Sequence, residues 1–232
     1  MSSLNGPKVF PPLESDPTLF TLLLHKLGAS AALHFEDVLS LNDPPKNAVA
    51  YVLIAPSKPG YDEALQQKEF QRTATLTEDE KAAAEGVIWL KQTIHNACGF
   101  YALLHAAVNV PSAASHFAPG SFLASVLRIK QPEEFKSFLE SSKTLYDAYI
   151  EVALQGQTKV ADDWAWEPPW HYIAFVGKDR RVWELNGARM GPVYRGEREV
   201  AEVVRESVEE QGDGRSCLLA LLHDGEGVSL KI

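Results

Sequence analysis

Apolar residues recur every three or four positions in several stretches of the chain, and each such stretch predicts an amphipathic helix. The best defined of them is 17–27. Asp16 can cap this helix and Pro17 suits its first position, whereas Gly28 favours its end. The same spacing predicts further helices over residues 35–39, 121–127, 132–139, 143–153 and 197–211. The polar stretch 61–84, rich in Glu, Gln, Lys and Ala, predicts a largely helical, solvated connection.

Apolar runs without helical spacing predict strands. Residues 48–55 are almost all apolar, which is typical of a strand buried on both faces. A shorter β-branched and aromatic run follows at 86–90. The runs 171–176 and 181–185 are joined by a Gly-Lys-Asp-Arg turn, which predicts a hairpin, and 216–222 predicts a final buried strand. Helices and strands are mixed along the chain, so we expect a single α+β domain with helices packed over one sheet.

The apolar run that begins near Cys98 predicts a buried helix with this cysteine at or near its first position. Unpaired backbone N–H groups and the positive end of the helix dipole favour the thiolate there. Gln92 lies six positions upstream, where a loop can bring its side-chain amide back toward the sulfur. That amide and the Cys98 backbone N–H together would form an oxyanion hole. The alternative is a small buried cysteine with no chemical role.

A base and an orienting residue follow in the second half of the chain. If the two strands of the predicted hairpin pair, His171 at the start of one and Asn186 after the other reach the same end of the sheet. The imidazole can take a thiol proton, and the Asn186 side-chain carbonyl can hold it in one tautomer. Each residue alone also has a purely structural explanation. His171 could be a hydrogen-bonded histidine at the start of a strand, and Asn186 could simply form a turn with the glycine that follows it.

Together these motifs resemble the ubiquitin carboxyl-terminal hydrolase family of papain-like cysteine peptidases (peptidase C12 type). The segments that carry the resemblance are QTIHNACG at 92–99, HYIAF at 171–175, ELNG at 184–187, PLE at 12–14 and GQT at 156–158. The resemblance covers nearly the whole chain. It implies a papain-like α+β fold, with a central antiparallel sheet flanked by helices and a knotted backbone, in one catalytic domain over residues 1–232.

The resemblance also implies an activity, which is hydrolysis at the C-terminal glycine of ubiquitin by a thiol nucleophile, without a cofactor. Cys98 would be the nucleophile, His171 the general base and acid, and Gln92 the oxyanion donor. Asn186 would orient the imidazole. Ubiquitin would contact the protein through its C-terminal tail and its globular face.

Three further residues are implied as substrate contacts, namely Glu14, Gln157 and Thr158. Glu14 matches an acidic position that the family associates with the basic tail of ubiquitin. Residues 154–163 would form a crossover loop, which admits only small adducts and short or unfolded peptides as leaving groups.

Two departures from the family pattern leave alternatives open. Asn186 stands where the family has Asp, and a neutral amide stabilises imidazolium less than a carboxylate does, which predicts slower turnover. The segment 164–170 is longer and richer in Trp than the family pattern. The alternatives are a ubiquitin-binding protein with the same fold but weak catalysis, and a hydrolase for a related modifier.

The charge and cysteine content of the chain indicate which classes of partner and which cellular compartment to expect. A net charge of −9 disfavours nucleic acid, and no apolar run suits a membrane span or a signal peptide. Two cysteines fit a reducing compartment, so we expect the cytoplasm, with the nucleus as a second possible location. We also expect a monomer. Cys217 should be a buried strand residue. His95 and His105 near Cys98 lack the second ligand pair of a zinc site, so we expect no metal.

Overall fold

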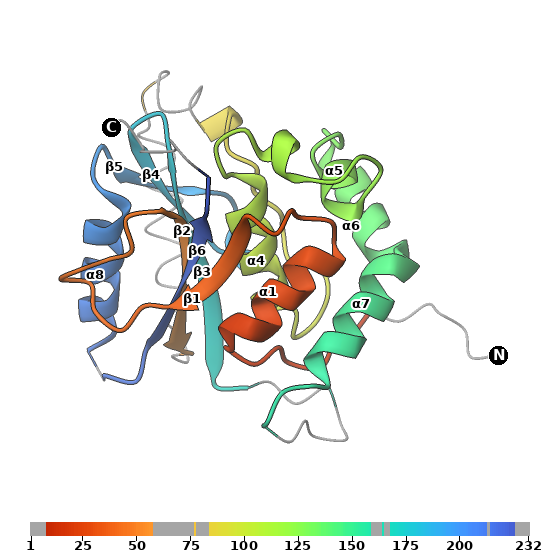
Figure 1. Cartoon of the computed structure of the whole chain (residues 1–232), viewed down its shortest axis with the longest axis horizontal. Helices are drawn as coiled ribbons and strands as arrows, with labels where there is room; N and C mark the ends of the chain where they lie inside the picture. The colour runs from red at the N-terminus through yellow and green to blue at the C-terminus, as the bar shows by residue number, and fades with distance from the viewer. Residues whose placement is uncertain are drawn as a thin grey trace.

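The structure, a computed structural model, describes residues 8–57, 77, 84–158, 164, 168–212 and 214–225. In this part of the chain, one six-stranded antiparallel sheet with the order β1-β6-β2-β3-β4-β5 separates two helical layers (Figure 1). The strands are β1 (Leu33–Asp37), β2 (Ala48–Pro56), β3 (Trp170–Lys178), β4 (Arg181–Leu185), β5 (Val193–Gly196) and β6 (Cys217–His223). The expected α+β class is confirmed.

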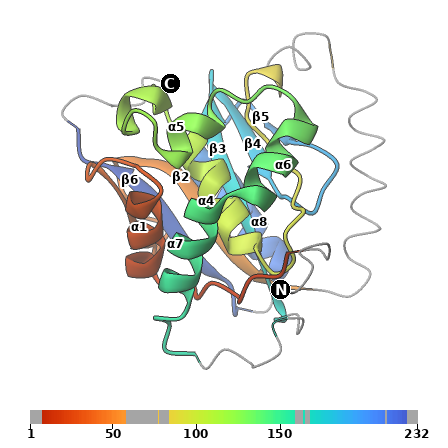
Figure 2. The same cartoon turned by 90° about the vertical axis from the view of Figure 1, so that its right-hand side faces the viewer.

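Helices cover both faces of the sheet. They are α1 (Pro17–Lys26), α4 (Cys98–Val108), the 3₁₀ helix η1 (Ala113–His116), α5 (Phe122–Val126), α6 (Pro132–Ser141), α7 (Lys143–Ala153) and α8 (Val200–Gln211). Helix α8 lies on one face, and α1, α4 and α7 lie on the other (Figures 1 and 2). Among the helices that the structure describes, none combines the length and the apolar character needed to cross a bilayer.

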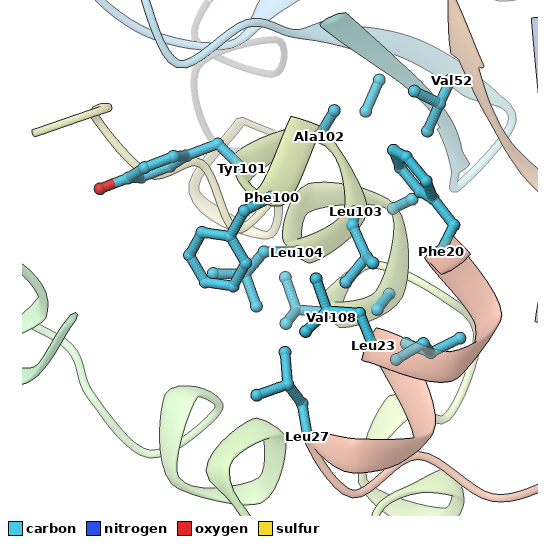
Figure 3. Packing of buried hydrophobic residues seen from close by; sticks show 14 of the residues in the cluster. Phe20, Leu23, Leu27, Val52, Phe100, Tyr101, Ala102, Leu103, Leu104 and Val108 are labelled. Carbon is cyan, nitrogen blue, oxygen red and sulfur yellow. The ribbon is translucent and has the colours of Figure 1, made fainter. Parts of the chain in front are cut away.

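Strand β2 is central because both of its faces are buried, as its continuous apolar run predicted. From Ala50 onward, its even-numbered residues, such as Val52, pack into the core under α4, and its odd-numbered residues, such as Leu53, pack into the core under α8. Helix α4 is apolar on almost every side and fills the larger core. Figure 3 shows Phe20 and Leu23 of α1 packed toward α4.

The predicted start and end of α1 are confirmed. The Asp16 carboxylate accepts a hydrogen bond from the Thr18 N–H at 2.7 Å, and Pro17 occupies the first turn. Gly28 has a φ of +106°, and a Cβ there would lie 2.2 Å from the Ser121 Cβ. The chain therefore needs glycine here both for its backbone conformation and for the close approach of α5.

The helix predicted over 35–39 is wrong, since residues 33–37 form strand β1. Leu33 and Phe35 are buried and His34 and Glu36 are more exposed, so the segment alternates with the period of a strand and pairs with β6. Strand β1 lies at the edge of the sheet, where the Thr21 hydroxyl accepts the Phe35 N–H at 2.8 Å.

The other predicted elements agree with the structure at most positions. The helices predicted at 121–127, 132–139 and 143–153 are confirmed as α5, α6 and α7, and the one predicted from 197 begins at Val200. Strand β5 was not predicted, because it is only four residues long and half-buried throughout. Nearly all of the connection predicted at 61–84 lies outside the described residues, and the knotted backbone stays a prediction.

The strand predicted over 86–90 is also wrong, because side chains of α4 and of its C-cap residue take the place of a neighbouring strand. The Asn109 side chain makes two hydrogen bonds to Ile88. Its Oδ1 accepts one from the Ile88 N–H at 2.8 Å, and its Nδ2 donates one to the Ile88 carbonyl at 2.9 Å. The Leu90 N–H donates to His105 Nε2 at 2.9 Å.

A third side chain continues the same pattern, since the Thr93 N–H donates to the Tyr101 hydroxyl at 3.1 Å. Tyr101 and His105 of α4 and Asn109, its C-cap residue, are spaced four residues apart and lie along one side of the helix; we call them the polar stripe. The extended segment 88–93 is therefore fixed against α4 without being part of the sheet.

The buried His105 makes stability depend on pH. Burial lowers its pKa from 6.5 to about 4, partly offset by the facing backbone of Leu90 and Leu185. Because the folded pKa is the lower one, unfolding takes up a proton as the pH falls from 6.5 to about 4, and stability is lost across that window. We expect this residue to contribute a loss of about 3 kcal/mol in the free energy of unfolding.

Urea unfolding at a series of pH values measures this loss. His105→Gln removes the titrating ring but keeps an amide that can hydrogen-bond, so its free energy of unfolding should fall less steeply in the same window. Parallel curves for the two proteins would contradict the assignment.

Candidate active site

Cys98 is the first residue of α4, as the sequence predicted. The first backbone N–H groups of a helix have no intrahelical partner, and the preceding Ala97 has no side chain that could cap them. The backbone N–H groups of Tyr172, Gly99 and Cys98 itself face the sulfur and lower the pKa of the thiol. Since Tyr172 directly follows His171 in β3, the sulfur lies beside the strand end that carries the predicted base.

The ionisation of Cys98 differs from the prediction. Burial raises the pKa of its thiol above the ordinary value, and the three N–H groups lower it only in part. The protein without substrate therefore favours the thiol, although the helix start alone favours the thiolate. Attack by this sulfur requires a base to remove the proton.

The hairpin that was predicted to unite His171 and Asn186 is confirmed. Strands β3 and β4 pair from Lys178 with Arg181 through to Ala174 with Leu185. His171 Nε2 lies 2.8 Å from Asn186 Oδ1, so the two predicted residues are in contact at one end of the sheet.

This contact also defines the tautomer of the imidazole. The Ala188 N–H donates to Asn186 Oδ1 at 2.9 Å, which requires an oxygen at that position and fixes the orientation of the amide. An oxygen facing His171 Nε2 means that Nε2 carries the hydrogen and donates. The lone pair of the neutral ring is then on Nδ1, which is the atom that can accept a proton.

Gln92 is packed directly against the turn that follows Asn186. Its backbone N–H donates to the Gly187 carbonyl at 2.9 Å, and a Cβ on Gly187 would lie 2.9 Å from the Gln92 Cβ. Glycine is thus required after Asn186 by the close approach of Gln92. The Gln92 amide donates to the Ile94 carbonyl at 3.2 Å, while its Oε1 is buried and has no hydrogen-bond partner among the described residues.

The residues predicted to contact substrate lie together at the start of the predicted crossover loop. Glu14 Oε2 accepts the Thr158 N–H at 3.1 Å. A Cβ on Gly156 would lie 2.5 Å from the same carboxylate oxygen, so the loop passes close over Glu14. Gln157 between them is exposed. Residues 159–163 of the predicted loop lie outside the described residues.

Asn96, for which the sequence predicted no separate role, links the two halves of the site. Its side-chain Nδ2 donates to the Trp164 carbonyl at 2.6 Å. This contact joins the loop before Cys98 to the segment before His171. Asn96 has a φ of +58°, and Asn tolerates this left-handed conformation better than most residues do. Its identity and its place in the QTIHNACG segment are the available signals.

The second cysteine lies at the surface. Cys217 is exposed at the first position of β6, so the prediction that it is buried is wrong. The apolar run begins only at the next residue, and Cys217 lies at the strand end. Within the described ranges, no group of three or more His, Cys, Asp or Glu side chains could hold a metal ion.

Comparison with known proteins places this arrangement in a family. The family model described as ubiquitin carboxyl-terminal hydrolase, family 1, matches residues 10–212. A ubiquitin carboxyl-terminal hydrolase of Drosophila melanogaster is 30% identical over 191 residues, which cover 80% of this chain and 81% of that protein. The human isozyme L1 is 30% identical over 226 residues, covering 90% of this chain and 96% of that protein.

A solved structure shows the same fold. The catalytic domain of Trichinella spiralis UCH37 bound to ubiquitin vinyl methyl ester superposes with a TM-score of 0.64 and 20% identity, covering 93% of this chain and 96% of that one. The family match spans most of the chain and includes Cys98, His171, Asn186 and Gln92. The chain therefore belongs to family 1 of the ubiquitin carboxyl-terminal hydrolases.

Proposed function

We propose that this protein is a thiol-dependent deubiquitinating hydrolase that cleaves small adducts or peptides from the C-terminal glycine of ubiquitin. The observation that carries the proposal is the 2.8 Å contact between His171 Nε2 and Asn186 Oδ1, beside a cysteine at a helix start. Membership of the family supports the same reaction.

The first half of the reaction forms a thioester. His171 Nδ1 accepts the proton of the Cys98 thiol, and the sulfur attacks the carbonyl carbon of the terminal glycine. The oxyanion is bound by the Cys98 backbone N–H and by Gln92 Nε2. This amide nitrogen has two hydrogens, so one can reach the oxyanion while the other remains on the Ile94 carbonyl. The thioester forms when the imidazolium donates its Nδ1 proton to the amine or thiol, which then departs.

The second half releases ubiquitin. The neutral ring removes a proton from the water that attacks the thioester, the carbon–sulfur bond breaks, and the proton passes to the Cys98 sulfur. Asn186 Oδ1 accepts a hydrogen bond from the Nε2–H group throughout the reaction, so that Nδ1 stays directed at the reacting atoms. The raised pKa of Cys98 supports this order, because the free thiol keeps its proton until the base removes it.

Substrate binding is assigned to the loop end of the site. Glu14, Gln157 and Thr158 lie together there, and the Glu14 carboxylate suits the basic tail of ubiquitin. The Trichinella spiralis UCH37 structures contain a ubiquitin derivative, which supports ubiquitin as the partner. Contact through both its C-terminal tail and its globular face is part of the proposal. The loop would limit the size of the leaving group.

The setting of this reaction is also part of the proposal. The two free cysteines support a reducing compartment, which we assign to the cytoplasm and also the nucleus, and the net charge of −9 disfavours a nucleic-acid partner. A monomeric enzyme without a membrane partner completes this part of the proposal. The extent of the family match supports one catalytic domain over the chain.

A second candidate is a ubiquitin-binding protein with weak turnover. The neutral amide of Asn186 favours it, because no carboxylate stabilises the imidazolium. A variant of the first proposal is a hydrolase that prefers a modifier closely related to ubiquitin. Competition kinetics between ubiquitin and the related modifier distinguishes the two.

A fluorogenic ubiquitin C-terminal amide tests the hydrolase directly. We expect turnover by the unmodified protein and a loss of at least about a thousandfold in Cys98→Ala, since the nucleophile is gone. Cys217→Ala is the matched control and should keep full activity. A ubiquitin derivative with an electrophilic C-terminus should form an adduct with the control and none with Cys98→Ala. Tight binding by the unmodified protein without an adduct would instead support the binding protein.

Asn186→Asp tests whether the amide limits the rate. The carboxylate would still accept from His171 and Ala188, and its negative charge would favour the imidazolium and hence the thiolate. We expect about a tenfold faster alkylation of Cys98 by iodoacetamide near neutral pH and a higher kcat. Asn186→Ala should be slower than both, because it lacks an acceptor for Nε2. If the Asp variant is no faster than the unmodified protein, the site already functions fully with an amide.

A further inference from the structure

The extended segment 88–93 is hydrogen-bonded on two sides. One side faces the polar stripe of α4. On the other, the Trp89 indole N–H donates to the Asn186 backbone carbonyl at 3.0 Å, and the Gln92 N–H donates to the Gly187 carbonyl at 2.9 Å. Lys91 Nζ donates to the carbonyls of Ala188 and Arg189, each at 2.9 Å. The segment thus lies between the helix of the nucleophile and the turn of the orienting residue.

We infer that Trp89 is a positioning residue for the hydrolase reaction: its indole N–H holds the backbone of Asn186 so that the Asn186 side chain stays in contact with His171. This inference rests on the proposed function. It adds to the reaction a side chain that touches neither the substrate nor the reacting atoms.

The geometry makes the Asn186 backbone a sensitive point. Asn186 is almost completely buried, and its Oδ1 already accepts from both His171 and Ala188. Only one side-chain torsion separates the backbone from the carbon that bears Oδ1, so a small rotation of the backbone moves the oxygen away from Nε2. Besides Trp89, the Asn186 carbonyl accepts only the Arg189 N–H, at 3.1 Å, among the described residues.

Trp89 can act in this way because the residues on either side of it are fixed. Ile88 is hydrogen-bonded to Asn109 and Leu90 to His105. His105 belongs to the helix that begins with Cys98, and Asn109 is the C-cap residue of the same helix. A rigid helix therefore holds the indole, and the indole holds the Asn186 turn. Lys91 makes similar contacts from an exposed position, where water competes for the same carbonyls.

Trp89→Phe removes the N–H donor and keeps an aromatic ring. We expect kcat for the fluorogenic ubiquitin amide to fall about fivefold, the value of one ordinary hydrogen bond, with KM unchanged. The matched control is Trp183→Phe on β4, because the Trp183 indole nitrogen is buried and has no hydrogen-bond partner among the residues described. This control should keep kcat within about twofold at a temperature where both variants are folded. Equal losses in the two variants would overturn the inference.

A double-mutant cycle tests the route of the effect. In an Asn186→Ala background there is no side-chain oxygen to position, so adding Trp89→Phe should cause little further loss. If Trp89→Phe costs the same factor in both backgrounds, the indole acts by some other route and the inference fails.

A measurement without substrate separates this inference from the proposed activity. The Nε2 hydrogen of His171 is bonded to Asn186, so its exchange with water, followed by NMR, should be faster in Trp89→Phe and unchanged in Trp183→Phe. Unchanged exchange in Trp89→Phe would overturn the inference. Absence of turnover in the unmodified protein would overturn the proposed function alone, because the exchange measurement does not depend on it.

Discussion

The hydrogen bonds between the polar stripe of α4 and the segment 88–93 are the constraint on which the site depends. Backbone groups that are buried outside helices and sheets need partners, and here Tyr101, His105 and Asn109 provide them. The same helix begins with Cys98 and fills the larger core. The position of Gln92 relative to the sulfur is therefore determined by one rigid element.

Much of the fold could be predicted because local signals and tertiary contacts agree. Asp16, Pro17 and Gly28 define α1 through capping and backbone conformation, which the chain itself determines. Segments 35–39 and 86–90 were misread because their structure depends on distant partners. Strand β1 needs the edge of β6, and the extended segment needs side chains of α4. Neither partner is visible in a local pattern.

The features of the site likewise fall into those that local sequence signals predict and those that depend on distant contacts. The contact of His171 with Asn186 followed from a hairpin whose turn and strands were both apparent in the sequence. The close packing of Gln92 on Gly187 and the role of Asn96 arise between loops that no periodicity relates. The preference of Cys98 for its thiol form was missed because burial is a property of the whole fold, whereas the helix start is a local one.

The hydrogen bond that the Phe35 N–H donates to the Thr21 hydroxyl disfavours aggregation of the protein at high concentration. An edge strand offers unpaired backbone donors to the strands of other molecules, and such pairing is a common start of aggregation. In β1 the middle donor of a five-residue strand is already occupied by α1. A strand from another molecule would have to displace this bond before it could extend the sheet, so the first helix protects the edge of the sheet that it covers.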